Sequence, residues 1–106
     1  MVVDELFHAL ADPTRRDILR VVLDHDESVS ALGRRYPMSL PAVQKHVLVL
    51  ERAGLVTKER RGREQRVSGV PSALAEAHRA IDELEAAWRG RFERIHDLLT
   101  ADPNGS

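Results

Sequence analysis

Residues 38–65 read MSLPAVQKHVLVLERAGLVTKERRGREQ. Ser39 is a typical helix N-cap, and Gly54 suits the position just past the end of a helix. After Gly54 the pattern changes to that of two short strands, at residues 55–60 and 65–68, joined across a turn that contains glycine. The stretch therefore predicts a helix followed by a β-hairpin.

Four further helices are expected around this stretch, and together they make one domain over residues 1–106. Apolar residues recur three and four apart in each helix, and both Ser28 and the Asp12-Pro13 pair suit a helix start. The fold is therefore expected to be mainly α with a small β-hairpin, a winged helix-turn-helix of about five helices and a two-stranded wing. The expected ranges of the four helices are 4–10, 13–24, 28–35 and 71 or 72 to about 100.

Composition excludes several classes of protein. The chain has 106 residues, 42% of them hydrophobic and 31% charged, as in one globular domain and unlike a disordered or fibrous chain. It has no cysteine, which excludes disulfides, thiolate metal ligands and thiol switching. The opening MVVDELFHAL does not resemble a secretion signal, and no segment is as apolar as a membrane span. We therefore expect a cytoplasmic protein with no membrane partner.

The net charge of −1 hides a strong segregation of sign along the chain. Residues 34–66 carry nine basic and three acidic side chains, whereas residues 1–33 and 67–106 are both acidic overall. An ordinary solvated surface mixes the two signs more evenly, so the middle third is expected to bind a polyanion. Double-stranded DNA is the polyanion that a winged helix-turn-helix binds.

The helix that follows Ser39 is expected to enter the major groove of DNA. Gln44 and Lys45 lie in its N-terminal half and can reach base edges, while Leu40 or Pro41 can touch thymine methyl groups. Ser39 and the free N–H groups beside it suit a phosphate. The predicted DNA contacts from this helix are Ser39, Leu40, Pro41, Gln44, Lys45 and Arg52.

The hairpin closes across Arg61-Gly62-Arg63-Glu64 and is rich in arginine. Its arginines are expected to follow the DNA backbone or to enter a narrow minor groove, where negative potential is concentrated. A charged edge hairpin that only prevents aggregation is the alternative interpretation. The predicted DNA contacts from the hairpin are Arg60, Arg61, Arg63 and Arg66.

The last helix is too long for one small core to cover. About 29 residues make a helix of roughly 43 Å, and its apolar stripe continues along it. A domain of this size also gains stability by sharing an apolar face with a second copy. We therefore expect a homodimer joined through residues 3–10 and 72–99. The predicted interface residues are Leu6, Phe7, Leu10, Leu74, Ile81, Leu84, Trp88 and Ile95.

Two segments resemble the ArsR-type winged-helix repressors: ALADPTRRDIL at residues 9–19, and the stretch at 38–65. The resemblance covers about residues 5–70 and rests on the combination of the two segments. It implies that the first and last helices build the dimer, that the fourth helix reads DNA and that the hairpin is the wing. Leu48 departs from the pattern, because similar proteins often have a polar or basic residue there.

Many proteins of this family sense metal ions. Where similar proteins have a cysteine pair on the third helix, this chain has Ser28 and Ser30, and neutral hydroxyls are poor ligands for soft ions. The other family site, on the last helix, is matched at its start by Glu76 and His78, but an arginine and a phenylalanine occupy its later positions. The resemblance therefore implies no complete metal site, and no cofactor is expected.

The expected function is that of a sequence-specific DNA-binding regulator, a repressor that binds a palindromic operator as a homodimer. One alternative is a metal-responsive repressor that uses the helical pairs His78 with Asp82 or Asp4 with His8. Another is a winged-helix adaptor that binds proteins. No nucleophile-base pair or glycine-rich phosphate loop is present, so no enzymatic activity is expected. The sequence indicates no effector.

Two arginines lie near the start of the second predicted helix. Arg15 and Arg16 follow the Asp12-Pro13 pair and lie close to Asp17 in the sequence. They are expected to form surface ion pairs with Asp12 or Asp17 rather than to contact DNA.

Overall fold

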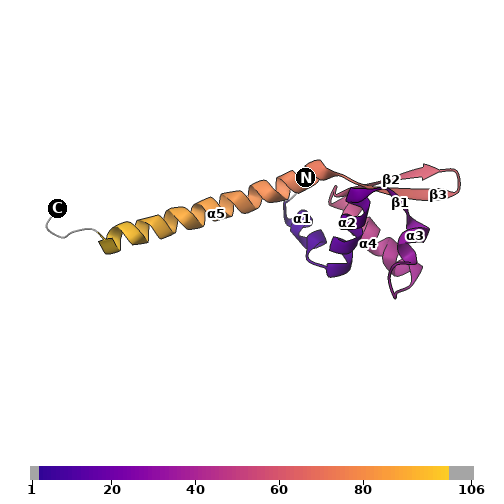
Figure 1. The fold of residues 1–106 in the computed structure, drawn as a ribbon, viewed down its shortest axis with the longest axis horizontal. Helices are drawn as coiled ribbons and strands as arrows, with labels where there is room; N and C mark the ends of the chain where they lie inside the picture. Colours follow the sequence, from indigo (N-terminus) through magenta and orange to yellow (C-terminus); the bar gives the residue numbers. More distant parts are fainter. Residues whose placement is uncertain (1–2, 101–106) are drawn as a thin grey trace.

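A computed structural model describes residues 3–100, in which a head of four helices and a small sheet carries one long helical arm (Figure 1). The remaining residues of the predicted domain, 1–2 and 101–106, lie outside the described range. Within residues 3–100, no helix combines the length and apolar character needed to cross a membrane. The elements are α1 Val3–Leu10, α2 Pro13–Asp24, β1 Glu27–Ser28, α3 Val29–Gly33, α4 Leu40–Arg52, β2 Val56–Arg61, β3 Glu64–Gly69 and α5 Pro71–Thr100.

The helices of the head begin where their capping residues predict. The side chains of Asp12, Ser28 and Ser39 each accept a hydrogen bond from the backbone N–H three residues later, at 3.0, 3.1 and 3.3 Å. These bonds satisfy N–H groups that the first turn of a helix leaves unpaired. The predicted starts of α2, α3 and α4 are therefore confirmed.

The third helix is shorter than predicted. It ends at Gly33 instead of near residue 35. A Cβ atom on Gly33 would lie 2.8 Å from Cδ1 of Leu40, so glycine at this position allows the end of α3 to approach the start of α4. This close approach forms the turn between the two helices of the helix-turn-helix.

The predicted hairpin is confirmed, and a third strand that was not predicted joins it. Strands β2 and β3 pair antiparallel with Arg61 opposite Glu64, across a two-residue turn in which Gly62 has a φ of 61°. Glycine is favoured at that positive φ. Strand β1 pairs with β3, so the sheet order is β1-β3-β2. A strand of two residues is too short to show the alternation by which strands are recognised in a sequence.

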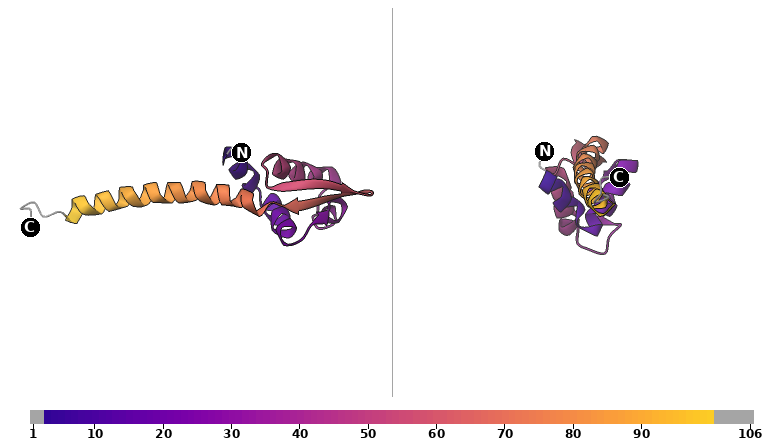
Figure 2. Two further views of the ribbon diagram at one scale, coloured as in Figure 1. Left: turned by 90° about the horizontal axis from the view of Figure 1, so that it is seen from above. Right: turned by 90° about the vertical axis from the view of Figure 1, so that its left-hand side faces the viewer.

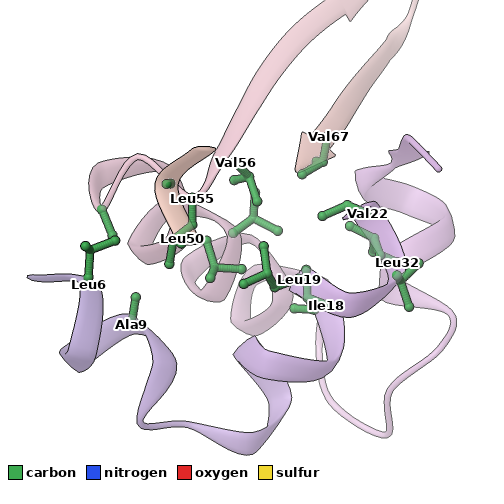
Figure 3. Packing of buried hydrophobic residues seen from close by; sticks show 14 of the residues in the cluster. Leu6, Ala9, Ile18, Leu19, Val22, Leu32, Leu50, Leu55, Val56 and Val67 are labelled. Atoms are coloured by element: carbon green, nitrogen blue, oxygen red, sulfur yellow. The ribbon is translucent and has the colours of Figure 1, made fainter. Parts of the chain in front are cut away.

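The hydrophobic core lies in the head, between its helices and one face of the sheet (Figure 3). Every helix of the head contributes buried apolar side chains, as do β2 and β3, whereas α5 contributes Ala73 and Ala77 near its start. The prediction that Leu6 belongs to a dimer interface is wrong, because its side chain is 0% exposed and fills the head's own core. Most of the length of α5 extends away from the head, as Figure 2 shows.

Two arginines at the start of α2 hold α1 in place. Arg15 and Arg16 donate side-chain hydrogen bonds, at 2.8 to 2.9 Å, to three backbone carbonyls in the last turn of α1. Those carbonyls are among the groups that a helix end leaves without a partner. The prediction that these arginines pair with Asp12 or Asp17 is wrong, since no such ion pair forms within residues 3–100. Their role is to orient α1 on the head.

Candidate nucleic-acid interface

A groove of about 290 Å³ lies between α3, α4 and the hairpin. Its polar side chains come from all three elements, and two of them, Lys58 and Arg63, are cationic. None of the residues that line it is acidic. A groove with this lining attracts anions such as DNA phosphates. Its polar lining residues are Ser30, Gln44, Lys58, Arg63 and Gln65.

Helix α4 turns its predicted base-reading residues outward. Val43, Val47 and Leu50 are buried in the core, so the opposite side of the helix faces solvent. Gln44 and Lys45 are both exposed there, close to the N-terminal end of the helix. Leu40 and Pro41 are exposed at the same end, as is Ser39, whose Oγ atom caps the helix. The structure therefore brings these five predicted residues to one surface beside the groove.

Arg52 lies at the opposite end of α4. Twelve residues separate it from Leu40, which corresponds to about 18 Å along the helix. It lines a pocket together with Glu5 and His8 of α1. The structure does not bring Arg52 together with the other predicted DNA contacts of this helix.

One face of the hairpin is turned toward the groove. Side chains alternate across a strand, and the register places Lys58 opposite Val67 and Arg60 opposite Gln65. Val67 is buried in the core, so the face that it shares with these residues is the one turned toward the helices. Lys58 and Gln65 indeed line the groove. Among the predicted hairpin contacts, Arg60 lies on this face and Arg63 lines the groove from the turn.

The outer face of the hairpin pairs its charges internally. Arg66 donates hydrogen bonds to Asp26 at 3.0 Å and to Glu64 at 3.1 Å. Arg61 lies 3.7 Å from Asp26 and 3.4 Å from Glu59. The hydrogen bond from Arg66 lowers the pKa of the Asp26 carboxyl below its ordinary value. Arg66 thus ties β3 to the segment before β1, and the structure does not place Arg61 or Arg66 with the groove residues.

Three polar residues of the groove, Ser30, Lys58 and Gln65, were not predicted from the sequence. Lys58 and Gln65 could have been found by counting in steps of two from the buried Val67, because alternate residues share a strand face. Nζ of Lys58 lies 3.4 Å from Oε1 of Glu51, which holds the strand against α4. Ser30 lies in the first turn of α3, and no sequence pattern marks it as a groove residue.

The residues considered as metal ligands do not assemble into a site. Within the described range, no group of three such side chains comes together. Nε2 of His78 lies 3.9 Å from Oδ2 of Asp82, and both side chains are exposed on α5. Ser28 is buried as the N-cap of α3.

The arm exposes a long apolar stripe. Ile81, Leu84, Trp88 and Ile95, all predicted at a dimer interface, are 47 to 68% exposed in the single chain. Exposed apolar residues that the prediction did not include extend the stripe at Phe92, Leu98 and Leu99. The other predicted interface residues, Phe7, Leu10 and Leu74, are partly buried and pack against the core of the head.

Comparison with known proteins agrees with this geometry. A family model described as a helix-turn-helix domain matches residues 10–59. The HTH-type transcriptional regulator Rv2034 of Mycobacterium tuberculosis is 35% identical over 79 residues, which are 74% of each protein. The transcriptional repressor SdpR of Bacillus subtilis is 28% identical over 60 residues, 57% of this chain and 67% of the repressor. The structure of an ArsR-like transcriptional regulator from Rhodococcus sp. RHA1 matches with a TM-score of 0.79 and 33% identity, covering 92% of both chains.

Proposed function

The chain belongs to the ArsR-type family of winged helix-turn-helix transcriptional regulators, and we propose that it is a repressor that occupies a palindromic DNA operator as a homodimer. As a member of this family it is a DNA-binding transcriptional regulator. The similarity to a transcriptional repressor supports repression as its mode of action. Bound to its operator in the cytoplasm, the protein hinders polymerase by occupying the promoter.

The groove between α4 and the hairpin is the observation that carries this proposal. The major groove of B-DNA admits one α-helix, and the N-terminal half of α4 presents Gln44 and Lys45 in the position to read base edges. The phosphates that border the DNA major groove then meet the cationic face of the hairpin, which carries Arg60 and Arg63. The proposed contacts are Ser39, Leu40, Pro41, Gln44, Lys45, Lys58, Arg60 and Arg63.

The exposed stripe on α5 supports the homodimer. A stripe of large apolar side chains at 47 to 80% exposure is typical of a surface that another chain covers. We propose that residues 3–10 and 72–99 of two copies cover one another, with Phe7, Leu10, Leu74, Ile81, Leu84, Trp88 and Ile95 at the contact. The two-fold axis of such a dimer requires inverted half-sites, with centres about one or two helical turns apart.

Binding of the full chain to the DNA upstream of its own gene tests the proposal directly. In a gel shift with that duplex and a scrambled duplex of the same length, we expect retention of the first at concentrations that leave the second free. Equal affinity for the two duplexes would contradict sequence-specific recognition. Binding of neither duplex at low salt would contradict DNA binding and favour the protein-binding adaptor.

The two faces of the hairpin can be compared by replacing one arginine on each. Replacing Arg63 with Ala should weaken binding to operator and random DNA alike, because phosphate contacts carry no sequence information. It should also flatten the plot of log affinity against log salt by about 0.9 for each phosphate that the variant no longer neutralises. The control is Arg61→Ala, which removes the same charge from the outer face. An equal change of slope in both variants would show that the groove face is not the DNA face.

A further inference from the structure

The hairpin extends beyond the part of the sheet that the head supports. Strands β2 and β3 pair over six residues each, as far as Arg61 opposite Glu64, whereas β1 pairs only with residues 66 and 67 of β3 (Figure 1). A two-stranded ribbon on its own is at best marginally stable in water. The position of Arg63 at the turn therefore depends on what fixes the base of the hairpin.

Side-chain contacts join the base of the hairpin to the head on both of its faces. On the groove face, Lys58 contacts Glu51 of α4. On the outer face, Nε of Arg66 donates to Oδ2 of Asp26 at 3.0 Å, and Nη2 of Arg66 donates to the backbone carbonyl of Asp26 at 3.2 Å. A planar guanidinium that binds two groups of one residue fixes the direction as well as the distance between the two segments.

The segment that carries Asp26 is itself held on the head. It connects the end of α2 to β1, and the ring nitrogens of His25 lie 3.1 Å from carboxylate oxygens of Asp24 and Glu27. Glu27 also accepts a hydrogen bond at 3.4 Å from Arg35, which follows the end of α3. Asp26 is therefore a fixed point of attachment on the head.

We propose that Asp26 is a positioning residue for DNA binding: through Arg66 it holds the hairpin at the angle at which Arg60 and Arg63 meet the DNA phosphates. Neither Asp26 nor Arg66 touches DNA in this arrangement, because their contact lies on the outer face of the hairpin. The free hairpin already has the position that it needs in the complex, so less conformational freedom is lost on binding. This inference rests on the proposed DNA-binding function and assigns a residue that supports it.

The charge of Asp26 makes this role testable by the sign of an effect. A carboxylate near a DNA-binding surface repels phosphates, so removal of the Asp26 charge would by electrostatics alone strengthen binding. Loss of a positioning contact predicts the reverse, which is weaker binding. Substitution of Arg66 does not distinguish the two roles, because the loss of a cation weakens DNA binding in either case.

Asp26→Ala should raise the Kd for operator and random DNA by about threefold to tenfold, because a contact between partly exposed ions contributes up to about fivefold and the dimer contains two such contacts. The matched control is Glu59→Ala. It removes the same charge from the outer face, at a residue that pairs with Arg61 of the hairpin at 3.4 Å and forms no ion pair with the head within residues 3–100. This control should bind DNA at least as tightly as the unmodified chain.

Two results of this comparison would overturn the positioning role. The first is an Asp26→Ala variant that binds DNA as tightly as the unmodified chain, or more tightly. The second is an equal loss of affinity in Glu59→Ala, which would show that the attachment to the head is not what matters.

A double-mutant cycle separates positioning from a loss of stability. In a chain that already carries Arg60→Ala and Arg63→Ala, the hairpin no longer offers its proposed phosphate contacts, and Asp26→Ala should change the Kd by less than about twofold. If Asp26 served only the stability of the head, its replacement would weaken binding equally in both backgrounds, and that result would overturn the proposal. Should Asp26→Ala unfold below the assay temperature, Asp26→Asn provides the same cycle with a smaller rise in Kd, because its amide oxygen still accepts a hydrogen bond.

The outcomes also separate this inference from the proposed function. If the unmodified chain binds neither duplex, the DNA-binding function is contradicted and the role of Asp26 falls with it. If the unmodified chain binds its operator and Asp26→Ala binds equally well, the function stands and only the role of Asp26 is overturned.

Discussion

Replacing Leu84 with Asp is expected to convert the dimer to monomers and to remove operator binding at concentrations that saturate the unmodified chain. Leu84 is 68% exposed in the single chain, so the head of the variant should fold normally. In the dimer the new carboxylate would be buried without a partner, which costs about 3 kcal/mol or more. That penalty raises the Kd of the dimer by more than about 100-fold.

The measurement is the mass in solution across a range of concentrations, followed by operator binding. A matched control is Ala86→Asp, which adds the same charge at an exposed position about 200° around the helix from Leu84. The control should remain dimeric and bind DNA. A Leu84→Asp variant that stays dimeric would show that the stripe on α5 is not the interface. If the unmodified chain is a monomer and binds DNA with full affinity, the proposal that it binds as a symmetric homodimer is contradicted.

Loss of sequence discrimination is the second large effect we expect. Replacing Gln44 or Lys45 with Ala should weaken operator binding by about 1–3 kcal/mol per half-site, because base-edge contacts carry the sequence information. A dimer makes such a contact in both half-sites, so the total is about 2–6 kcal/mol when the two half-sites act independently. The affinity for random DNA should fall much less. The ratio of operator affinity to random affinity should therefore fall.

Arg52→Ala is the matched control for this experiment. Arg52 is an exposed cation on the same helix, but it lies beside α1, away from the N-terminal half that faces the groove. Competition binding at several salt concentrations should leave its ratio of operator to random affinity unchanged. If Gln44→Ala and Lys45→Ala also leave the ratio unchanged, α4 is not the reading helix.

The order and type of every element except β1 could be predicted from the sequence, because the signals for the others are local. A capping side chain bonds an N–H group three residues away, as Asp12, Ser28 and Ser39 do. Helical periodicity and the change to a two-residue period after Gly54 are equally short-range. The outward position of Gln44 and Lys45 also followed, since it depends only on which residues of the same helix are apolar.

Which charged and apolar side chains are available to a partner depends on tertiary packing and could not be predicted. Arg66 binds Asp26, forty residues earlier in the chain, and Arg52 lies beside α1. Because both contacts join distant segments, a local sequence pattern could not show that these arginines lie away from the groove. Leu6 has the periodicity of an interface residue and yet is buried in the head, whereas Leu84 with the same periodicity is exposed. The physical reason is that periodicity identifies the apolar face of a helix, but only the packing of distant segments determines what covers that face.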